Sequence, residues 1–221
     1  MSTCGIHSHG LLEYPLFFGY VSAEQQGSRT MLTHEQRREL LRIARSSIAA
    51  ALQQSGQTAG DPDIHPSKEL LKPQGAFVTI RMNRELRGCI GYLESLLPLA
   101  EVVSEVAVKA ALDDPRFPPM LSSELGRATL EISVLSPMHR ISSVDEIRIG
   151  EHGLMLEHGF GKGVLLPQVA TEYGWNAEEF LEAVCRKSGL HRWAWKDPGA
   201  RISVFSAEVI DEEEVLREHP V

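Results

Sequence analysis

The strands that this sequence predicts occur mostly in adjacent pairs, and this pairing constrains the fold more than any other feature. Residues 75–80 and 86–92 read as two strands around a turn at 82–85, and residues 153–158 and 163–166 form a second pair. Helical segments fall between the pairs rather than after each single strand. Because strands joined by short turns run antiparallel, the pattern predicts an α+β fold with a mainly antiparallel sheet flanked by helices.

Local signals indicate where the helices begin and end. Thr33 and Gln36 form a capping-box pattern before an apolar repeat every four residues, which predicts a helix that ends near Gln54. Pro98 begins a second helix, and the proline-rich stretch 113–119 stops it. A further capping pattern begins at Asn176 and a late strand covers 201–209; together these elements fill the chain between residues 32 and 210.

The chain divides into three parts by composition. Residues 1–31 mix Gly, Ser and His with one isolated apolar patch and are predicted to be an extension of the main body. Residues 32–210 have the length of one large domain or two small, intimately packed subdomains. Residues 211–221 form an acidic tail that we expect to be a solvated end.

Charge and cysteine content exclude several classes of protein. The 22 Lys and Arg against 30 Asp and Glu give a net charge of −8, which disfavours binding to nucleic acid. The early apolar patch 14–21 is too short to cross a bilayer, and the N-terminus carries no secretion signal. Three widely separated cysteines do not form a disulfide framework. We therefore expect a cytoplasmic protein that binds neither a membrane nor nucleic acid.

The hexapeptide Leu86-Arg87-Gly88-Cys89-Ile90-Gly91 contains the first candidate for chemistry. Cys89 stands between two glycines, which allow another group to approach the backbone closely. One interpretation is a small, buried strand residue, because unpaired cysteine is often buried and inert. The other is a reactive thiol tuned by Arg87, since strand alternation places these two side chains on one face.

Asp114 and Arg116, in the segment Asp113-Asp114-Pro115-Arg116-Phe117, are the next candidates. They could bind a polar ligand or supply a general base at the end of a helix. The alternative is a rigid turn in which the two residues pair with each other or cap neighbouring backbone groups. The sequence leaves both interpretations open.

Other polar residues give weaker signals. Glu131 is an acid in an otherwise apolar strand, and it faces either solvent or the site. The glycines at 159, 161 and 163 do not match a phosphate-binding loop and predict a hairpin turn, where Lys162 could reach a ligand. Cys4, His7 and His9 are too few for a structural metal site. We predict no metal and no cofactor.

The tryptophans are expected to be packing anchors, although an exposed tryptophan can mark a partner surface. They are Trp175, Trp193 and Trp195.

Five ordered motifs identify the chain as similar to a known family. They are the hexapeptide Leu86–Gly91, Asp114-Pro115-Arg116-Phe117, residues 130–135, Leu165-Leu166-Pro167-Gln168-Val169-Ala170, and residues 175–190. Together they resemble the AMMECR domain family, known in prokaryotes as AmmeMemoRadiSam system protein A, and the resemblance covers about 33–209. It implies an α+β fold of two subdomains with a cleft between them. It also implies a genetic association with a radical S-adenosylmethionine enzyme and a Memo-type protein.

Two functions follow as expectations. The first is an accessory component that acts with those two proteins and has a small-molecule cleft; its oligomeric state is not specified by the sequence. The second is an enzyme that uses Cys89 as a nucleophile or thiolate. For such a site we predict catalytic roles for Cys89, Arg87 and Glu131, and substrate binding by Asp114, Arg116, Lys162 and Gln168.

Overall fold

The computed structural model describes residues 31–53 and 66–218. One antiparallel sheet runs through this part of the chain in the order β2-β1-β3-β7-β5-β6, and β4 also pairs with β7. The strands are β1 (Ala76–Met82), β2 (Glu85–Tyr92), β3 (Ala128–Leu135), β4 (His139–Arg140), β5 (His152–His158), β6 (Gly161–Leu165) and β7 (Arg201–Asp211). The predicted α+β class and the two hairpins, β1–β2 and β5–β6, are confirmed.

Helices gather at the two ends of this sheet. They are α1 (His34–Gln53), α2 (Leu99–Leu112), α3 (Ser122–Leu125), α4 (Pro167–Tyr173), α5 (Ala177–Lys187) and α6 (Glu212–Glu218). Three short 3-10 helices complete the set: η1 (Lys68–Leu71), η2 (Val144–Glu146) and η3 (Ala194–Lys196). Among the helices of the described residues, none is long and apolar enough to span a bilayer.

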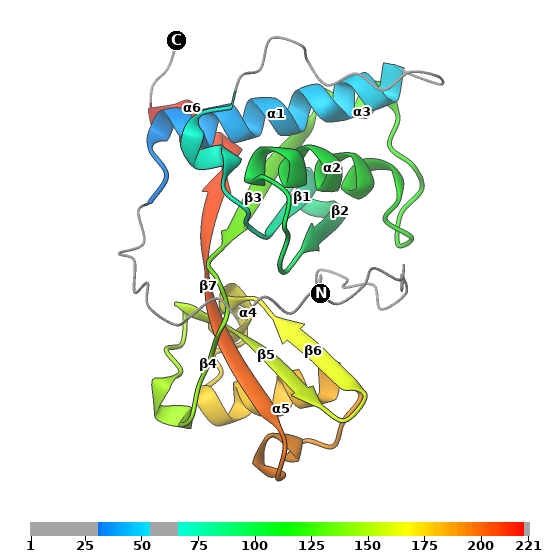
Figure 1. Ribbon diagram of the computed structural model, residues 1–221. Coiled ribbons are helices and arrows are strands. Elements are labelled where there is room, and N and C mark those ends of the chain that lie inside the picture. Colours follow the sequence, from blue (N-terminus) through cyan, green and yellow to red (C-terminus); the bar gives the residue numbers. More distant parts are fainter. Residues whose placement is uncertain (1–30, 54–65, 219–221) are drawn as a thin grey trace.

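The long strand β7 joins two subdomains (Figure 1). Its first half, 201–206, pairs with β5, and its second half, 207–211, pairs with β3. The first subdomain contains α1, α2, α3, α6, β1, β2, β3 and the second half of β7. The second subdomain contains the remaining strands with α4, α5 and the first half of β7.

Each subdomain has its own apolar core. In the first, α2 packs on β1 and β2, and α1 packs on the far side of α2 (Figure 1). In the second, α5 packs on β5 and β6. A third set of buried side chains comes from both subdomains and is called the linking cluster below: Phe77, Cys89, Leu135, Met155, Val164 and Phe205.

The capping signals define the helix ends as predicted. The Thr33 amide donates to Gln36 Oε1 (2.9 Å) and the Gln36 amide donates to Thr33 Oγ1 (3.3 Å), which satisfies amides at the start of α1. The same reciprocal pair forms between Asn176 and Glu179 at the start of α5 (2.9 and 3.0 Å).

The acidic tail is not a solvated end over residues 212–218, which form α6. The Glu212 carboxylate is buried, forms an ion pair with Arg45 and accepts a hydrogen bond from the Leu130 amide (2.9 Å). Val215 is buried in the core of the first subdomain. The expectation of a solvated tail was wrong because one carboxylate of the acidic run, Glu212, has a partner, Arg45, that lies far away in the sequence. The predicted extension 1–31 lies outside the described residues apart from Met31.

Candidate functional site

The hexapeptide Leu86–Gly91 lies in β2, at one edge of the sheet. Its pairing with β1 is regular on both sides of a shift between Ile80 and Arg81. At that shift Arg87 is the extra residue of a β-bulge, because its two neighbours take up the pairing positions opposite β1. The bulge interrupts the alternation of side chains along β2.

This bulge changes which side chains accompany Cys89. Leu86, rather than Arg87, packs against the linking cluster that contains Cys89. Arg87 extends instead to α3, where its guanidinium forms two hydrogen bonds with the Glu124 carboxylate (3.0 and 3.1 Å). The prediction that Arg87 and Cys89 share a face is therefore wrong, since simple alternation does not hold across a bulge.

The two glycines of the hexapeptide serve close packing. A Cβ atom at Gly88 would overlap the carbonyl oxygen of Ala110 in α2, and one at Gly91 would overlap the Phe77 ring. Gly88 thus lets a helix approach the strand, and Gly91 makes room for an aromatic ring of the linking cluster. Close packing therefore explains both glycines of the hexapeptide without a catalytic role.

Cys89 lies between the two subdomains. Its relative exposure is 1%, and the other members of the linking cluster come from β1, β3, β5, β6 and β7. The Thr79 hydroxyl donates a hydrogen bond to Cys89 Sγ (3.2 Å). Of the two interpretations made from the sequence, the surroundings of Cys89 match those of a buried strand residue.

Asp114 and Arg116 bind the backbone of Cys89. Asp114 Oδ2 accepts a hydrogen bond from the Cys89 amide (2.8 Å), and Arg116 Nη2 donates one to the Cys89 carbonyl (3.2 Å). Because β2 is an edge strand, these two backbone groups point away from β1 and require other partners. The Asp114–Arg116 turn supplies them, as one of the two interpretations of this motif predicts.

The same turn is internally paired. Arg116 donates to Asp114 through Nε (2.9 Å), Nη2 (2.6 Å) and its backbone amide (3.1 Å). Burial by itself would raise the pKa of Asp114, but hydrogen bonds from Arg116 and from the Cys89 amide outweigh it and lower the pKa. Asp114 is therefore held as a carboxylate, which suits a backbone clamp better than a general base.

Glu131 occupies the same row of the sheet as Cys89. Thr79 on β1 is the cross-strand neighbour of both residues, and Asp211 on β7 is the cross-strand neighbour of Glu131 on its other side. Glu131 lies 3.6 Å from Arg81 Nη2 and is mostly buried, with 19% of its side chain exposed. Burial raises its pKa; Arg81 opposes this effect, while Asp211 adds to it.

The two remaining predicted residues lie in the second subdomain. Lys162 is on β6, where its ammonium group pairs with Glu157 of the adjacent strand (3.2 Å). Gln168 is the second residue of α4 and is half-buried. Their contacts do not join them to the Asp114–Arg116 clamp in the described part of the chain, so the structure brings together Cys89, Asp114 and Arg116, with Glu131 two strands away.

Sequence reasoning missed three residues that contact the predicted site residues. Thr79 and Arg81 alternate on β1, and this alternation was the available signal that both point to the face of Cys89. Glu124, the partner of Arg87, had no comparable signal because α3 is only four residues long.

Metal binding has no support among residues 31–53 and 66–218, which contain no group of three His, Cys, Asp or Glu side chains placed to hold an ion. Cys4, His7 and His9 lie outside the described residues. Cys185, expected in the core, is buried in the second subdomain, and burial raises the pKa of its thiol.

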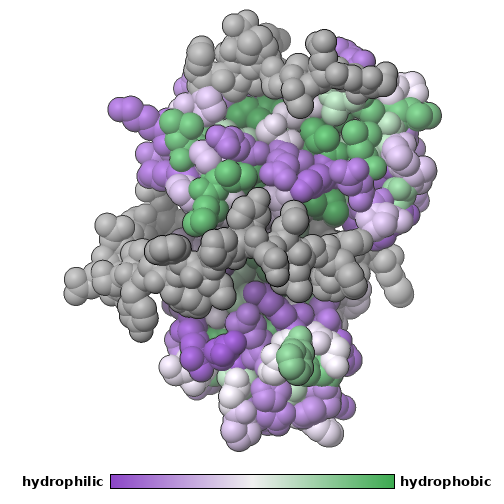
Figure 2. All heavy atoms as spheres, turned by 45° about the vertical axis from the view of Figure 1, so that its right-hand side comes forward, coloured by the Kyte–Doolittle hydropathy of each residue, from purple (hydrophilic) through white to green (hydrophobic). Residues whose placement is uncertain are grey.

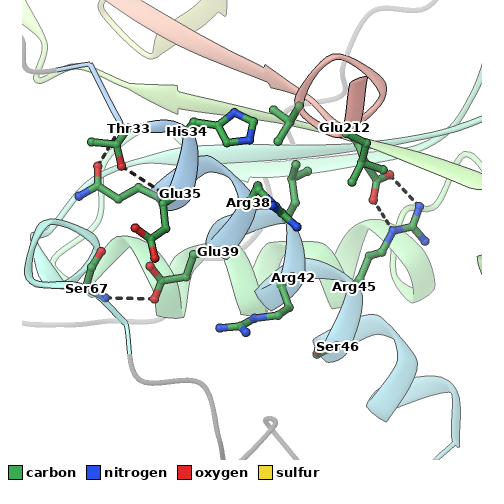
Figure 3. Close-up of a pocket in the computed structure, with 14 residues that line it drawn as sticks. Thr33, His34, Glu35, Arg38, Glu39, Arg42, Arg45, Ser46, Ser67 and Glu212 are labelled. Carbon is green, nitrogen blue, oxygen red and sulfur yellow. Dashed lines mark hydrogen bonds and ion pairs between the residues drawn. The ribbon is translucent and has the colours of Figure 1, made fainter. Parts of the chain in front are cut away.

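A groove away from these residues runs along the outer face of α1 (Figure 3). Its volume is about 1380 Å³, and α6 and Ser67 form its other walls. The Glu39 carboxylate accepts a hydrogen bond from the Ser67 amide (3.1 Å), and Arg45 pairs with Glu212 (Figure 3). None of the predicted site residues lines this groove.

Comparison with known proteins places the chain in a family. The AMMECR1 family model matches residues 41–210. The chain belongs to the AMMECR1 family. A protein of Thermococcus gammatolerans is 41% identical over 184 residues, covering 79% of this chain and 89% of that protein. A protein of Methanothermobacter thermautotrophicus is 42% identical over 188 residues, covering 82% and 97%.

A solved AMMECR1-like structure has the same fold. The crystal structure of the uncharacterized protein PH0010 from Pyrococcus horikoshii matches with a TM-score of 0.72 and 36% identity, covering 79% of this chain and 90% of that one. The names of these relatives state no activity. Membership of the AMMECR1 family therefore establishes the fold, and the function has to be argued from the residues.

Proposed function

We propose that this AMMECR1-family protein is an accessory component that binds another protein, rather than an enzyme that uses Cys89 as its nucleophile. The surroundings of Cys89 carry this proposal: the side chain is 1% exposed inside the linking cluster. A catalytic nucleophile needs access to its substrate, and a side chain buried to this degree does not offer that access.

The residues expected to assist Cys89 have structural partners. Arg87 pairs with Glu124, and Asp114 with Arg116 holds the backbone of β2. Using these groups for catalysis would require breaking the ion pair of Arg87 with α3 or the contacts of Asp114 and Arg116 that close the edge of the sheet. A role in packing accounts for all three without that cost.

The proposed partners are the radical S-adenosylmethionine enzyme and the Memo-type protein that the family resemblance implies. The test is to purify each partner and measure its Kd for the full chain by biolayer interferometry, with the wild type and with Cys89→Ala. We expect at least one partner to bind, and the Cys89→Ala variant to bind within about threefold of the wild type. Absence of binding to both partners would reject the proposal.

The enzyme alternative has its own test. After reduction, the native chain is treated with iodoacetamide and the labelling of each cysteine is followed by mass spectrometry between pH 6 and 9. Cys185, which is also buried, is the internal comparison. We expect Cys89 to be as protected as Cys185 until the protein is unfolded. Fast labelling of Cys89 alone, already near pH 6, would favour the enzyme.

A further inference from the structure

Two aromatic side chains project from the end of the second subdomain. Phe160, in the turn between β5 and β6, has a relative exposure of 112%, and Trp193, in the loop after α5, has 53%. Exposed aromatic rings of this size are uncommon on a surface that only faces water. In Figure 2 the lower lobe shows a small hydrophobic area surrounded by hydrophilic residues.

The two segments that carry these rings lie together. A Cβ atom at Gly161 would lie 2.8 Å from the Leu190 side chain, so the turn packs directly against the loop after α5. The Asp197 carboxylate lies 2.9 Å from His191 and 3.6 Å from His158, which ties the same loop to the end of β5. Phe160, Leu190 and Trp193 are called the aromatic end below.

The hairpin turn that carries Phe160, and the Trp193 ring, are held in place before any partner arrives. The hairpin closes with His158 opposite Gly161, and Gly159 takes a φ of +58° in the turn. The Arg192 guanidinium lies 4.9 Å from the centre of the Trp193 ring and contacts both Glu182 oxygens at 2.8 Å. An anchor on an already ordered backbone loses less conformational entropy when it binds.

The charge of the segments that carry the aromatic end is opposite to that of the whole chain. Residues 157–163 and 186–201, together with Glu182, contain six Lys or Arg and three Asp or Glu, whereas the full chain has a net charge of −8. Lys162 and Arg201 lie 3.2 and 3.6 Å from Glu157. These cations are already paired with a carboxylate. Such a mixture of charges is typical of the polar border of a protein–protein interface, whereas binding to the phosphates of a nucleic acid favours unpaired cations.

A second exposed apolar patch differs in composition. Leu71, Leu96 and Leu97 have relative exposures of 50%, 96% and 42% in the first subdomain. The bridge between Pro73 and Pro98 brings η1 and the loop before α2 together. Residues that dominate binding energies are enriched in tryptophan, tyrosine and arginine, and leucine is under-represented among them. The aromatic end has the stronger composition of the two.

We propose that the aromatic end is the docking surface for a partner protein that offers an apolar pocket bordered by carboxylates. This inference rests on the proposed accessory function and names the surface that performs it. Phe160 enters the pocket, and the surrounding cations face the partner's acids.

The test compares variants in binding to the two purified proposed partners. We expect Phe160→Ser combined with Trp193→Ser to weaken the Kd by about tenfold or more, as for a pair of anchor residues. Leu96→Ser combined with Leu97→Ser is the matched control and should stay within about threefold. Phe160→Ser alone is measured as well, in case the double variant does not fold. Circular dichroism melts verify that each variant is folded.

The outcomes separate the two proposals. If the wild type binds a partner and the aromatic variants bind equally well, the docking surface is rejected and the accessory function stands. If the wild type binds neither partner, the accessory function is rejected and the docking surface with it. If the aromatic variants retain partner binding but lose affinity for a single-stranded oligonucleotide or for phosphatidylserine vesicles, the surface serves a different ligand and the proposal is overturned.

Discussion

The first and last strands in the order of the sheet, β2 and β6, use the same packing device and leave different groups exposed. Gly88 in β2 lets α2 approach, and Gly163 in β6 lets α5 approach, since a Cβ at either position would overlap an atom of the helix segment. On β2, Asp114 and Arg116 bind the outer backbone groups. On β6, the strand begins at a turn that presents Phe160 to solvent.

The difference between the two strands shows that the motif that identifies the family and the proposed binding surface lie in different places. The charged and sulfur-containing residues near β2 look like chemistry in the sequence, but they are engaged in closing one sheet edge. The hairpin of β5 and β6 looks like an ordinary turn, yet it carries the more exposed aromatic side chain. A motif that defines a fold can therefore lie away from the surface that binds a partner.

The largest expected effect is that of a side chain at Gly88. The obstacle is a helix carbonyl, which cannot rotate away, so we expect Gly88→Ala to lower the free energy of unfolding by about 3 kcal/mol or more. Gly163→Ala should cost less, about 1–3 kcal/mol, because the nearest atom is a serine hydroxyl that can rotate and the nearest backbone atom, Ser188 N, is 2.8 Å from the Cβ position, farther than the Ala110 carbonyl oxygen is at Gly88.

Gly126→Ala is the control for these glycine variants. Gly126 has no atom within 4 Å of a Cβ position and a φ of −67°, so alanine there should be neutral or stabilise by up to about 1 kcal/mol. Urea denaturation of the three variants measures the order of their free energies of unfolding. Equal midpoints for Gly88→Ala and Gly126→Ala would contradict the packing role of the motif.

Removing the clamp on β2 should have the next largest effect. Asp114→Ala leaves the buried Cys89 amide without its acceptor, which costs about 2–3 kcal/mol. Asp113→Ala, one residue earlier at an exposed position, should change stability by less than about 0.5 kcal/mol. Hydrogen exchange of the Cys89 amide gives a local readout, and it should be faster only in the Asp114 variant.

The pH dependence should have opposite signs at the two carboxylates. The lowered pKa of Asp114 gives stability that is present above the ordinary aspartate value of about 3.9 and is lost as pH falls through the lower folded value. Asp114→Asn should therefore be less stable than the wild type at pH 7, and the difference should shrink only in strong acid.

Glu131 has a raised pKa, so its ionisation destabilises the folded state as pH rises above the ordinary glutamate value of about 4.3. We expect Glu131→Gln to be slightly more stable than the wild type at pH 7 and equal to it near pH 4. Guanidinium denaturation between pH 4 and 7 measures this trend. A Glu131→Gln variant that is less stable than the wild type at pH 7, with the deficit disappearing toward pH 4, would show that the Arg81 ion pair outweighs burial.

The smallest expected change in stability is at the aromatic end. Phe160 is fully exposed, so Phe160→Ser should alter the free energy of unfolding by less than about 0.5 kcal/mol while it weakens partner binding. Phe160→Leu is the conservative control. A loss of more than about 1 kcal/mol would mean that Phe160 packs against the protein rather than serving as a free anchor.

Local signals in the sequence predicted most of the elements. The Thr33–Gln36 and Asn176–Glu179 capping boxes formed as expected, and the proline-rich segment after α2 ended that helix. Short elements were missed, namely α3, β4, α6 and the three 3-10 helices, because two to seven residues carry too little periodicity to distinguish them from loops.

The candidate site was harder to predict than the fold. The sequence correctly placed Asp114 and Arg116 in a paired turn as one of two interpretations, but it could not say which backbone they would bind. Alternation failed at Arg87 because one extra residue in β2 moves the side chain to the other side of the strand.

By itself, the sequence determined the α+β class, the hairpins, the helix ends and the AMMECR1 family, since these depend on local patterns and on motifs in a fixed order. Only the tertiary structure decided that Cys89 is buried between two subdomains and that Phe160 is exposed. Burial depends on which distant strands meet at a given point, and β7, which crosses both subdomains, brings those strands together.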